Sequence, residues 1–291
     1  MPSQVPPGYT RGSIMFIAHA TSTVHAARIY QHLWNEAGGY GARIVLIAQP
    51  GAEQSADQLA GLLRDWEVDS VRIIQLTDRH SAMEPSHAPL VEGATGLVLV
   101  GHDAPSFASM LGGTHLAQAI RKTNARSKTV CAVGGCGAML CQHVPVTIPE
   151  SGSRPRVAFL PGLGLINRLA LWTASADAPP AAGDETVTAE LFTAVATNPF
   201  LVAVAPAADT GLVVYADTTL EVFGVNHALL VDGATVTATN LYTAPDAPLV
   251  VDGAALYRLT PGYTFNFDTR LILPPTESDI PPAGELPSSA F

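Results

Sequence analysis

The sequence predicts an α/β fold, a mostly parallel sheet flanked by helices, with a β-rich C-terminal part. Two observations support this prediction. Up to about residue 155, short continuous runs of Val, Ile and Leu alternate with segments of helical periodicity, as in parallel sheets covered on both faces. Beyond that point, short β-rich runs are separated by turn signals such as Asp232-Gly233 and Pro261-Gly262, which are typical of hairpins.

The apolar runs of the first part are expected to be buried strands, at 13–20, 42–49, 70–77, 96–103 and 129–135. The first helix should follow Thr21 or Ser22, either of which could cap it, and should end at Gly38-Gly39. Further helices are expected at 55–66, 105–124 and 184–198, the second of them broken at Gly112-Gly113.

The domain boundaries follow from composition. Residues 1–12 are expected to form a flexible arm, residues 13–272 a single α/β domain, and residues 273–291 a Pro-rich tail without a core of its own. The opening residues lack the pattern of a signal peptide. No apolar run reaches the about 18 residues that a membrane span needs. We therefore expect a cytoplasmic protein without a membrane partner. The Ala-rich, Lys-poor composition suggests a bacterial source.

Charge and motifs narrow the function classes. The net charge is −10, and Lys122 and Lys128 are the two lysines, which argues against a nucleic-acid partner and is compatible with a cationic small substrate. The three cysteines match neither a disulfide framework nor a standard zinc spacing. The segment PGLGL lacks the lysine of a phosphate loop, so no cofactor is expected.

The stretch Gly134-Gly135-Cys136-Gly137-Ala138 is the strongest candidate for chemistry. A nucleophile on a sharp strand-to-helix turn needs small neighbours, and the helix N-terminus would favour a thiolate. The plain alternative is a small buried cysteine at a close-packed turn. Cys131 and Cys141 are expected to be packing residues.

With this turn, the chain resembles the cyanophycinase-like serine peptidases of the class I glutamine-amidotransferase-like superfamily over roughly residues 13–268. The matching segments are 101–120, 134–139, 162–166, 201–214, 220–233 and 257–267. The resemblance places Cys136 at the nucleophile and Asp209 and Thr210 in the substrate-binding region. It implies a small peptide or isopeptide substrate, including one that contains aspartate and arginine, and a homodimer by analogy.

The chain departs from the family pattern at four places. Cysteine replaces the nucleophilic serine, and the segment 167–180, where the family carries its catalytic histidine, contains none. Ala207-Ala208 stand where the family has an acidic pair, and His102-Asp103-Ala104 replace Gly-Asn-Gln. Another base would therefore have to serve the thiol.

Reactive groups in open parallel sheets gather beyond the carboxyl ends of the strands, where His19, His102 and Cys136 are expected. We expect His102 as the base or ion-pair partner of Cys136, with packing or helix capping as its alternative. The resemblance implies an oxyanion hole made by the backbone N–H of Gly101 or His102, together with that of Gly137. His19 and Asp103 are expected to contact the substrate. A zinc site made of His19, His102 and Cys136 is a further alternative. His143 is expected about two turns along a helix after Cys136, exposed.

Three functions remain open. The first is a cysteine-nucleophile amide hydrolase or acyl-transferring enzyme for a small peptide-like or isopeptide substrate, with a role in secondary metabolism as one option. The second is a catalytically inactive homologue that binds a ligand or a protein partner. The third is a thiol sensor or lyase-like enzyme that uses the same turn without hydrolysis.

Overall fold

The central feature is a nine-stranded sheet, seen in a computed structural model that describes residues 4–148, 156–173, 184–244 and 247–275. Its order is β17-β16-β11-β10-β1-β5-β4-β2-β3. The parallel strands are β1 (Ile14–Ile17), β5 (Thr129–Val133), β4 (Gly96–Val100), β2 (Arg43–Ala48) and β3 (Ser70–Gln75). The antiparallel strands are β10 (Thr210–Val214), β11 (Thr219–Gly224), β16 (Thr264–Asn266) and β17 (Ile272–Leu273).

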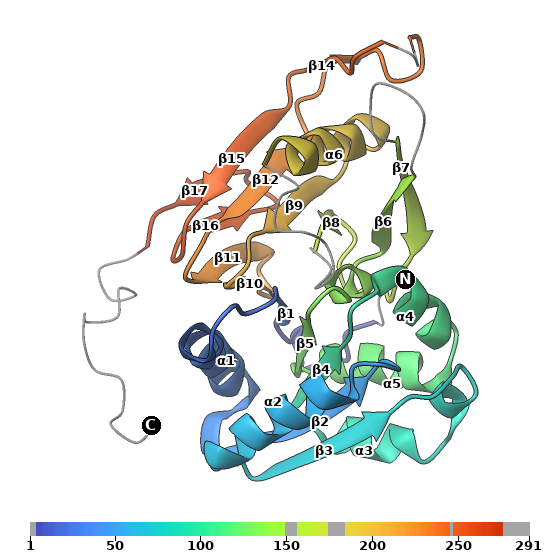
Figure 1. The fold of residues 1–291 in the computed structure, drawn as a ribbon, viewed down its shortest axis with the longest axis vertical. Helices are drawn as coiled ribbons and strands as arrows, with labels where there is room; N and C mark the ends of the chain where they lie inside the picture. The colour runs from blue at the N-terminus through green and yellow to red at the C-terminus, as the bar shows by residue number, and fades with distance from the viewer. Residues whose placement is uncertain (1–3, 149–155, 174–183, 245–246, 276–291) are drawn as a thin grey trace.

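Helices cover both faces of the parallel half (Figure 1). Helices α1 (Thr23–Ala37) and α2 (Glu53–Asp65) pack on one face, and α3 (His87–Gly93), α4 (Ala104–Leu111) and α5 (His115–Asn124) on the other. Successive strand residues point to opposite faces, so Met15 and Ile17 join the core under α1 and α2, whereas Phe16 joins the core under α4 and α5. The inner strands β1, β4 and β5 are almost entirely apolar because both of their faces are buried.

Local signals begin and end these helices as the sequence predicts. The Ser22 hydroxyl accepts a hydrogen bond from the His25 N–H at 3.2 Å, so Ser22 rather than Thr21 caps α1. Gly38 ends this helix with a φ of 112°, in the left-handed region that glycine adopts readily. The interruption at Gly112-Gly113 separates α4 from α5, and Thr114 caps the second of these helices.

The C-terminal part forms a second, four-stranded sheet in the order β15-β12-β9-β8. Its strands are β15 (Ala255–Leu259), β12 (Ala228–Asp232), β9 (Val202–Pro206) and β8 (Leu169–Leu171), and α6 (Asp184–Thr197) packs on it. Two strand pairs complete the chain, β6 (His143–Ile148) with β7 (Arg156–Pro161) and β13 (Ala238–Thr239) with β14 (Val251–Asp252). The predicted fold class, an α/β sheet with a β-rich C-terminal part, is confirmed.

The structure differs from the sequence prediction at several places, including the strands β6 and β8, which were not expected. After Cys136 the chain makes only a short 3-10 turn, Gly137–Leu140, so neither Cys141 nor His143 lies on an α-helix. Helix α3 and a 3-10 turn at Ser81–Met83 fill a segment for which no element was expected. The end of the expected arm is tied down, because the Gly12 N–H donates to the Asn124 carbonyl at 2.8 Å.

Most of the expected Pro-rich tail, residues 276–291, lies outside the described residues. Within the described part of the chain, the structure shows no helix long and apolar enough to cross a membrane.

Phe16 allows a test of the core. Its side chain is fully buried at the centre of the sheet, so Phe16→Ala should lower the free energy of unfolding by about 3–5 kcal/mol. Tyr242→Ala is the matched control, because Tyr242 is 75% exposed and should change stability by less than about 0.5 kcal/mol. Urea unfolding measures both, and equal effects would contradict the assignment of the core.

Candidate functional site

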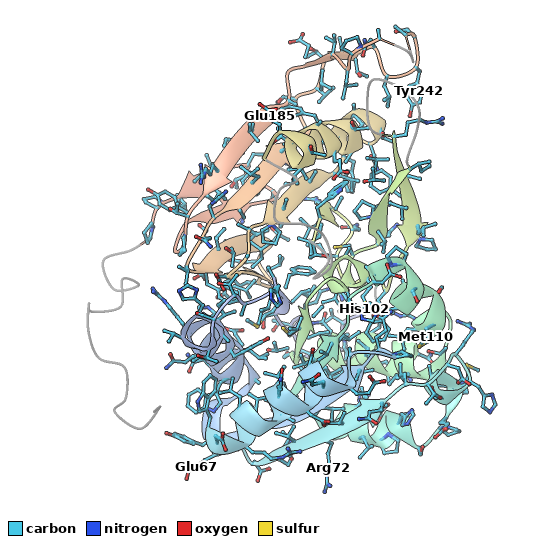
Figure 2. All side chains as sticks on the ribbon, in the orientation of Figure 1. Glu67, Arg72, His102, Met110, Glu185 and Tyr242 are labelled. Atoms are coloured by element: carbon cyan, nitrogen blue, oxygen red, sulfur yellow. The ribbon has the colours of Figure 1, made fainter. Side chains whose placement is uncertain are left out.

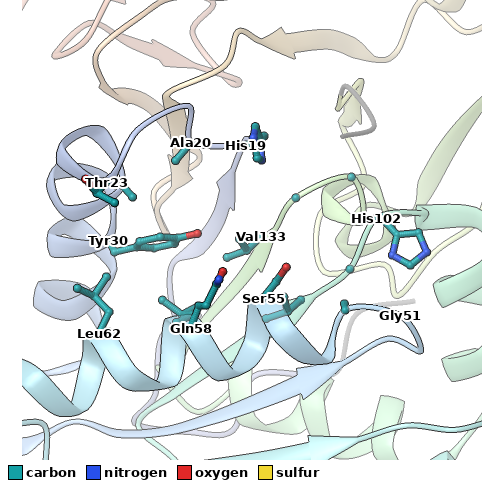
Figure 3. Close-up of a pocket in the computed structure, with 17 residues that line it drawn as sticks. His19, Ala20, Thr23, Tyr30, Gly51, Ser55, Gln58, Leu62, His102 and Val133 are labelled. Carbon is teal, nitrogen blue, oxygen red and sulfur yellow. The ribbon is translucent and has the colours of Figure 1, made fainter. Parts of the chain in front are cut away.

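A crevice of about 890 Å³ opens at the carboxyl ends of the parallel strands, between α1 and α2 (Figure 3). This is the edge at which open parallel sheets bind ligands. The crevice is lined by residues from both helices and from the turns that follow the strands: His19, Ala20, Thr23, Ala26, Tyr30, Gly51, Ala52, Ser55, Gln58, Leu59, Leu62, Val100, Gly101, His102, Val133, Gly134 and Gly135.

The structure brings His19 and His102 to this crevice. His19 follows β1 and His102 follows β4, and both side chains are exposed at the opening (Figure 2, Figure 3). Tyr30 reaches into the same space from α1, and Ser55 and Gln58 extend into it from α2 (Figure 3). The crevice therefore combines two imidazoles with uncharged polar groups and an apolar floor.

A buried glutamine, not anticipated from the sequence, holds the turn after β4. Gln49 Oε1 accepts the backbone N–H groups of His102 and Asp103 at 3.1 and 3.2 Å, and Gln49 Nε2 donates to the Asp103 carbonyl at 3.3 Å. The Gly101 N–H donates to the Val133 carbonyl at 3.2 Å, so this expected oxyanion donor is already engaged. The signal in the sequence that could have indicated the role of Gln49 is its position as a polar residue at the end of an apolar run.

The turn after β5 has the sharp geometry of a nucleophile elbow, but its crevice side carries no side chain. Gly134 follows the strand with a φ of 83°, the strained position of such a turn. A Cβ on Gly134 would lie 2.6 Å from the Gly101 carbonyl oxygen, and one on Gly135 would lie 2.1 Å from that of His102. Backbone from the turn after β4 therefore fills the space that a nucleophilic side chain would need.

Cys136 does not line the crevice. It is fully buried in the core under α4 and α5, and its thiol donates to the carbonyl oxygens of Val133 at 3.3 Å and Leu99 at 3.6 Å. Burial raises the pKa of Cys136 to about 12. A 3-10 turn stands where the sequence leads us to expect a helix N-terminus, and burial opposes the thiolate. The role of Cys136 as a nucleophile stays a prediction.

The direction of Cys136 also separates it from the two histidines. His102 lines the crevice, whereas the thiol points into the core on the other side of the turn. The expected base–nucleophile pair and the alternative zinc site made of His19, His102 and Cys136 both require the thiol to face the crevice. This geometry supports neither arrangement.

Three further expected site residues have structural contacts. The Asp103 carboxylate caps α4 by accepting the Ser106 N–H at 3.0 Å. Gly137 is buried, its N–H donates to the Gly134 carbonyl at 3.4 Å, and it does not line the crevice. Thr210 is fully buried in β10. The structure therefore places these residues beneath or beside the crevice.

Asp209 connects the C-terminal part to the rim of the crevice. Its carboxylate accepts the Thr21 N–H at 2.6 Å and the Thr21 hydroxyl, and it lies 3.0 Å from His25 Nδ1. The Asp209 N–H donates to the His19 carbonyl at 3.0 Å. Asp209 therefore fixes the loop that carries His19, without lining the crevice itself. Burial opposes its ionisation, yet the hydrogen bonds from Thr21 and the nearby His25 lower the pKa of Asp209 overall.

Ionisation of Cys136 predicts an alkaline dependence of stability. Because its pKa is raised to about 12 in the folded protein, the stabilisation is complete below the unfolded value near ~8.5 and is lost as the pH rises towards 12. Between pH 9 and 11, the free energy of unfolding should fall with rising pH more steeply in the wild type than in Cys136→Ala, by about 1.4 kcal/mol per pH unit. Urea unfolding at several pH values measures the two slopes, and equal slopes would refute a buried, protonated thiol.

Asp209→Asn tests the anchor at the rim. The substitution removes a buried carboxylate acceptor and should lower the free energy of unfolding by about 1–3 kcal/mol at pH 6. The folded pKa of Asp209 is lowered, so its stabilisation is present above the unfolded value near ~3.9 and is lost as the pH falls through the folded value. The difference in the free energy of unfolding between wild type and Asp209→Asn should therefore become smaller below about pH 4. Asp57→Asn, at an exposed position of α2, is the control. A difference between wild type and Asp209→Asn that stays constant with pH would argue against an ionised Asp209 carboxylate.

The similarities of this chain to known proteins are consistent with its fold. No family model matches the chain. It is 24% identical over 267 residues to a cyanophycinase from Geminocystis herdmanii, covering 90% of this chain and 96% of that one. It is 24% identical over 276 residues to a cyanophycinase from Trichormus variabilis, covering 92% and 90%. The crystal structure of a peptidase from an acI-B1 Actinobacterium shares the fold, with a TM-score of 0.64 and 18% identity over 89% of this chain and 98% of that one. The chain is therefore a distant homologue of the cyanophycinases and resembles the cyanophycinase-like peptidase family over most of its length.

Proposed function

We propose that the chain binds a small peptide-like molecule in the crevice between α1 and α2, without covalent capture by a nucleophile on the turn after β5. Its cyanophycinase relatives support a function in the hydrolase class, as a peptidase. The observation that carries the binding proposal is the turn itself, where Gly134 and Gly135 face the crevice and backbone oxygens occupy the space of a side chain.

The crevice suits a small ligand. Its volume of about 890 Å³ lies within the range of small-molecule sites, and its lining is apolar with a few convergent polar groups. Tyr30, Ser55 and Gln58 offer hydroxyl and amide groups of the kind that bind peptide bonds. The crevice also lies beyond the carboxyl ends of the strands, where ligands bind in sheets of this type.

Relationship to the cyanophycinases favours a second candidate, hydrolysis or acyl transfer through Cys136. In that reaction the thiolate attacks the amide carbonyl, His102 protonates the departing amine, and water or another amine releases the acyl group from the thioester. The turn at Gly101 and His102 would first have to move away from Gly134 and Gly135 to uncover the thiol. The candidate is therefore distinguished by its dependence on Cys136.

Isothermal titration with a β-linked aspartyl-glutamine dipeptide tests the crevice. Ser55→Trp fills it and should weaken binding at least about tenfold, since the ligand and the indole compete for one volume. Gln54→Trp is the matched control, because Gln54 is the preceding residue of α2, is exposed and does not line the crevice. Unchanged affinity in Ser55→Trp would refute the proposed location.

The same dipeptide distinguishes the two candidates. Binding without covalent capture predicts that Cys136→Ala retains the wild-type affinity and that neither protein releases aspartate, measured by amine labelling and mass spectrometry. Release of aspartate by the wild type and its loss in Cys136→Ala would replace the binding proposal by the thiol mechanism.

A further inference from the structure

The charge of the crevice lining restricts the ligand. Among the described residues, the seventeen that line it include no aspartate, glutamate, lysine or arginine. The groups that reach into the space between the two helices are the Tyr30 hydroxyl, the Ser55 hydroxyl and the Gln58 amide (Figure 3). Burial raises the pKa of Tyr30, so its hydroxyl keeps its proton and remains a neutral hydrogen-bond donor.

Besides Asp103, whose carboxylate caps α4, two carboxylates lie near the crevice, and each has other partners. Glu53 is exposed beside His102, and its Oε1 accepts the Gly51 N–H at 3.0 Å. Asp209 is buried behind the rim, where it accepts hydrogen bonds from Thr21 and lies against His25. Neither is among the lining residues. A cation that entered between α1 and α2 would therefore find no carboxylate partner among the lining residues.

We propose that the crevice selects a peptide-like ligand whose end between α1 and α2 is uncharged and carries an amide, and that it discriminates against a guanidinium or ammonium group there. The inference rests on the proposed function, because it concerns the ligand of the same crevice. An amide presents one acceptor and two donors, which match the Tyr30 hydroxyl, the Gln58 amide and the Ser55 hydroxyl. Gln58 is the residue that sets this preference.

A matched pair of probes tests the charge preference. β-Aspartyl-glutamine and β-aspartyl-arginine share their linkage and differ at one side chain, neutral in one and cationic in the other. By isothermal titration, the wild type should bind the glutamine probe at least about tenfold more tightly, because the lining offers amide and hydroxyl partners but no carboxylate for a guanidinium. Gln58→Glu places a carboxylate in the crevice and should reverse the order of the two affinities.

Gln54→Glu adds the same charge to the same helix outside the crevice and should leave the wild-type order unchanged. Equal affinities, or tighter binding of the arginine probe by the wild type, would overturn the charge preference while leaving the binding proposal intact. Binding of neither probe would overturn the proposed function and this inference together. An identical response of Gln58→Glu and Gln54→Glu would show that net charge, and not the crevice lining, sets the preference.

Discussion

The contact between the turns after β4 and β5 determines whether a side chain of the second turn can project into the crevice. The turn after β4, held by Gln49, places the carbonyl oxygens of Gly101 and His102 directly against Gly134 and Gly135. Only glycine fits there, because any Cβ would meet backbone oxygen well inside van der Waals distance. The packing keeps the strained geometry of an elbow after β5 and removes the space in which an elbow presents a nucleophile. The crevice opens beside this closed turn, between α1 and α2.

The environment of Cys136 follows from the same packing. Two opposing effects act on a thiol near a strand-to-helix turn, a helix dipole that favours the thiolate and burial that opposes it. The helix dipole contributes little to the pKa of Cys136, because the chain continues as a 3-10 turn and then as β6. Burial raises this pKa strongly, because the thiol is enclosed by the core under α4 and α5. Desolvation therefore decides the outcome, and the cysteine behaves as a small core residue.

Sequence reasoning predicted the elements whose signals are local or periodic. Continuous apolar strands and the helix break at Gly112-Gly113 follow from residue patterns that act over a few positions. The turns at Asp232-Gly233 and Pro261-Gly262, which were expected to close hairpins, instead connect strands of different sheets, because β12 pairs with β9 and β15 whereas β16 pairs with β11 and β17. The positions of His19 and His102 at one crevice followed from parallel topology. The direction of Cys136 could not be predicted, because it depends on a contact with a turn about 35 residues earlier in the chain. The contacts of Asp209 could not be predicted for the same reason, since its partners Thr21 and His25 are far away in sequence.

The position of β1 has a consequence for the autonomy of the two halves of the chain. β1 lies between β5, from the parallel half, and β10, from the β-rich part, and it hydrogen-bonds to both. Excising the C-terminal part would leave one edge of this apolar strand unpaired, a template for association with other chains. It would also free the loop that carries His19, which Asp209 holds from the far side. The two halves are therefore not separable modules. The β-rich part completes the sheet, and through Asp209 it also holds the loop that carries the crevice residue His19.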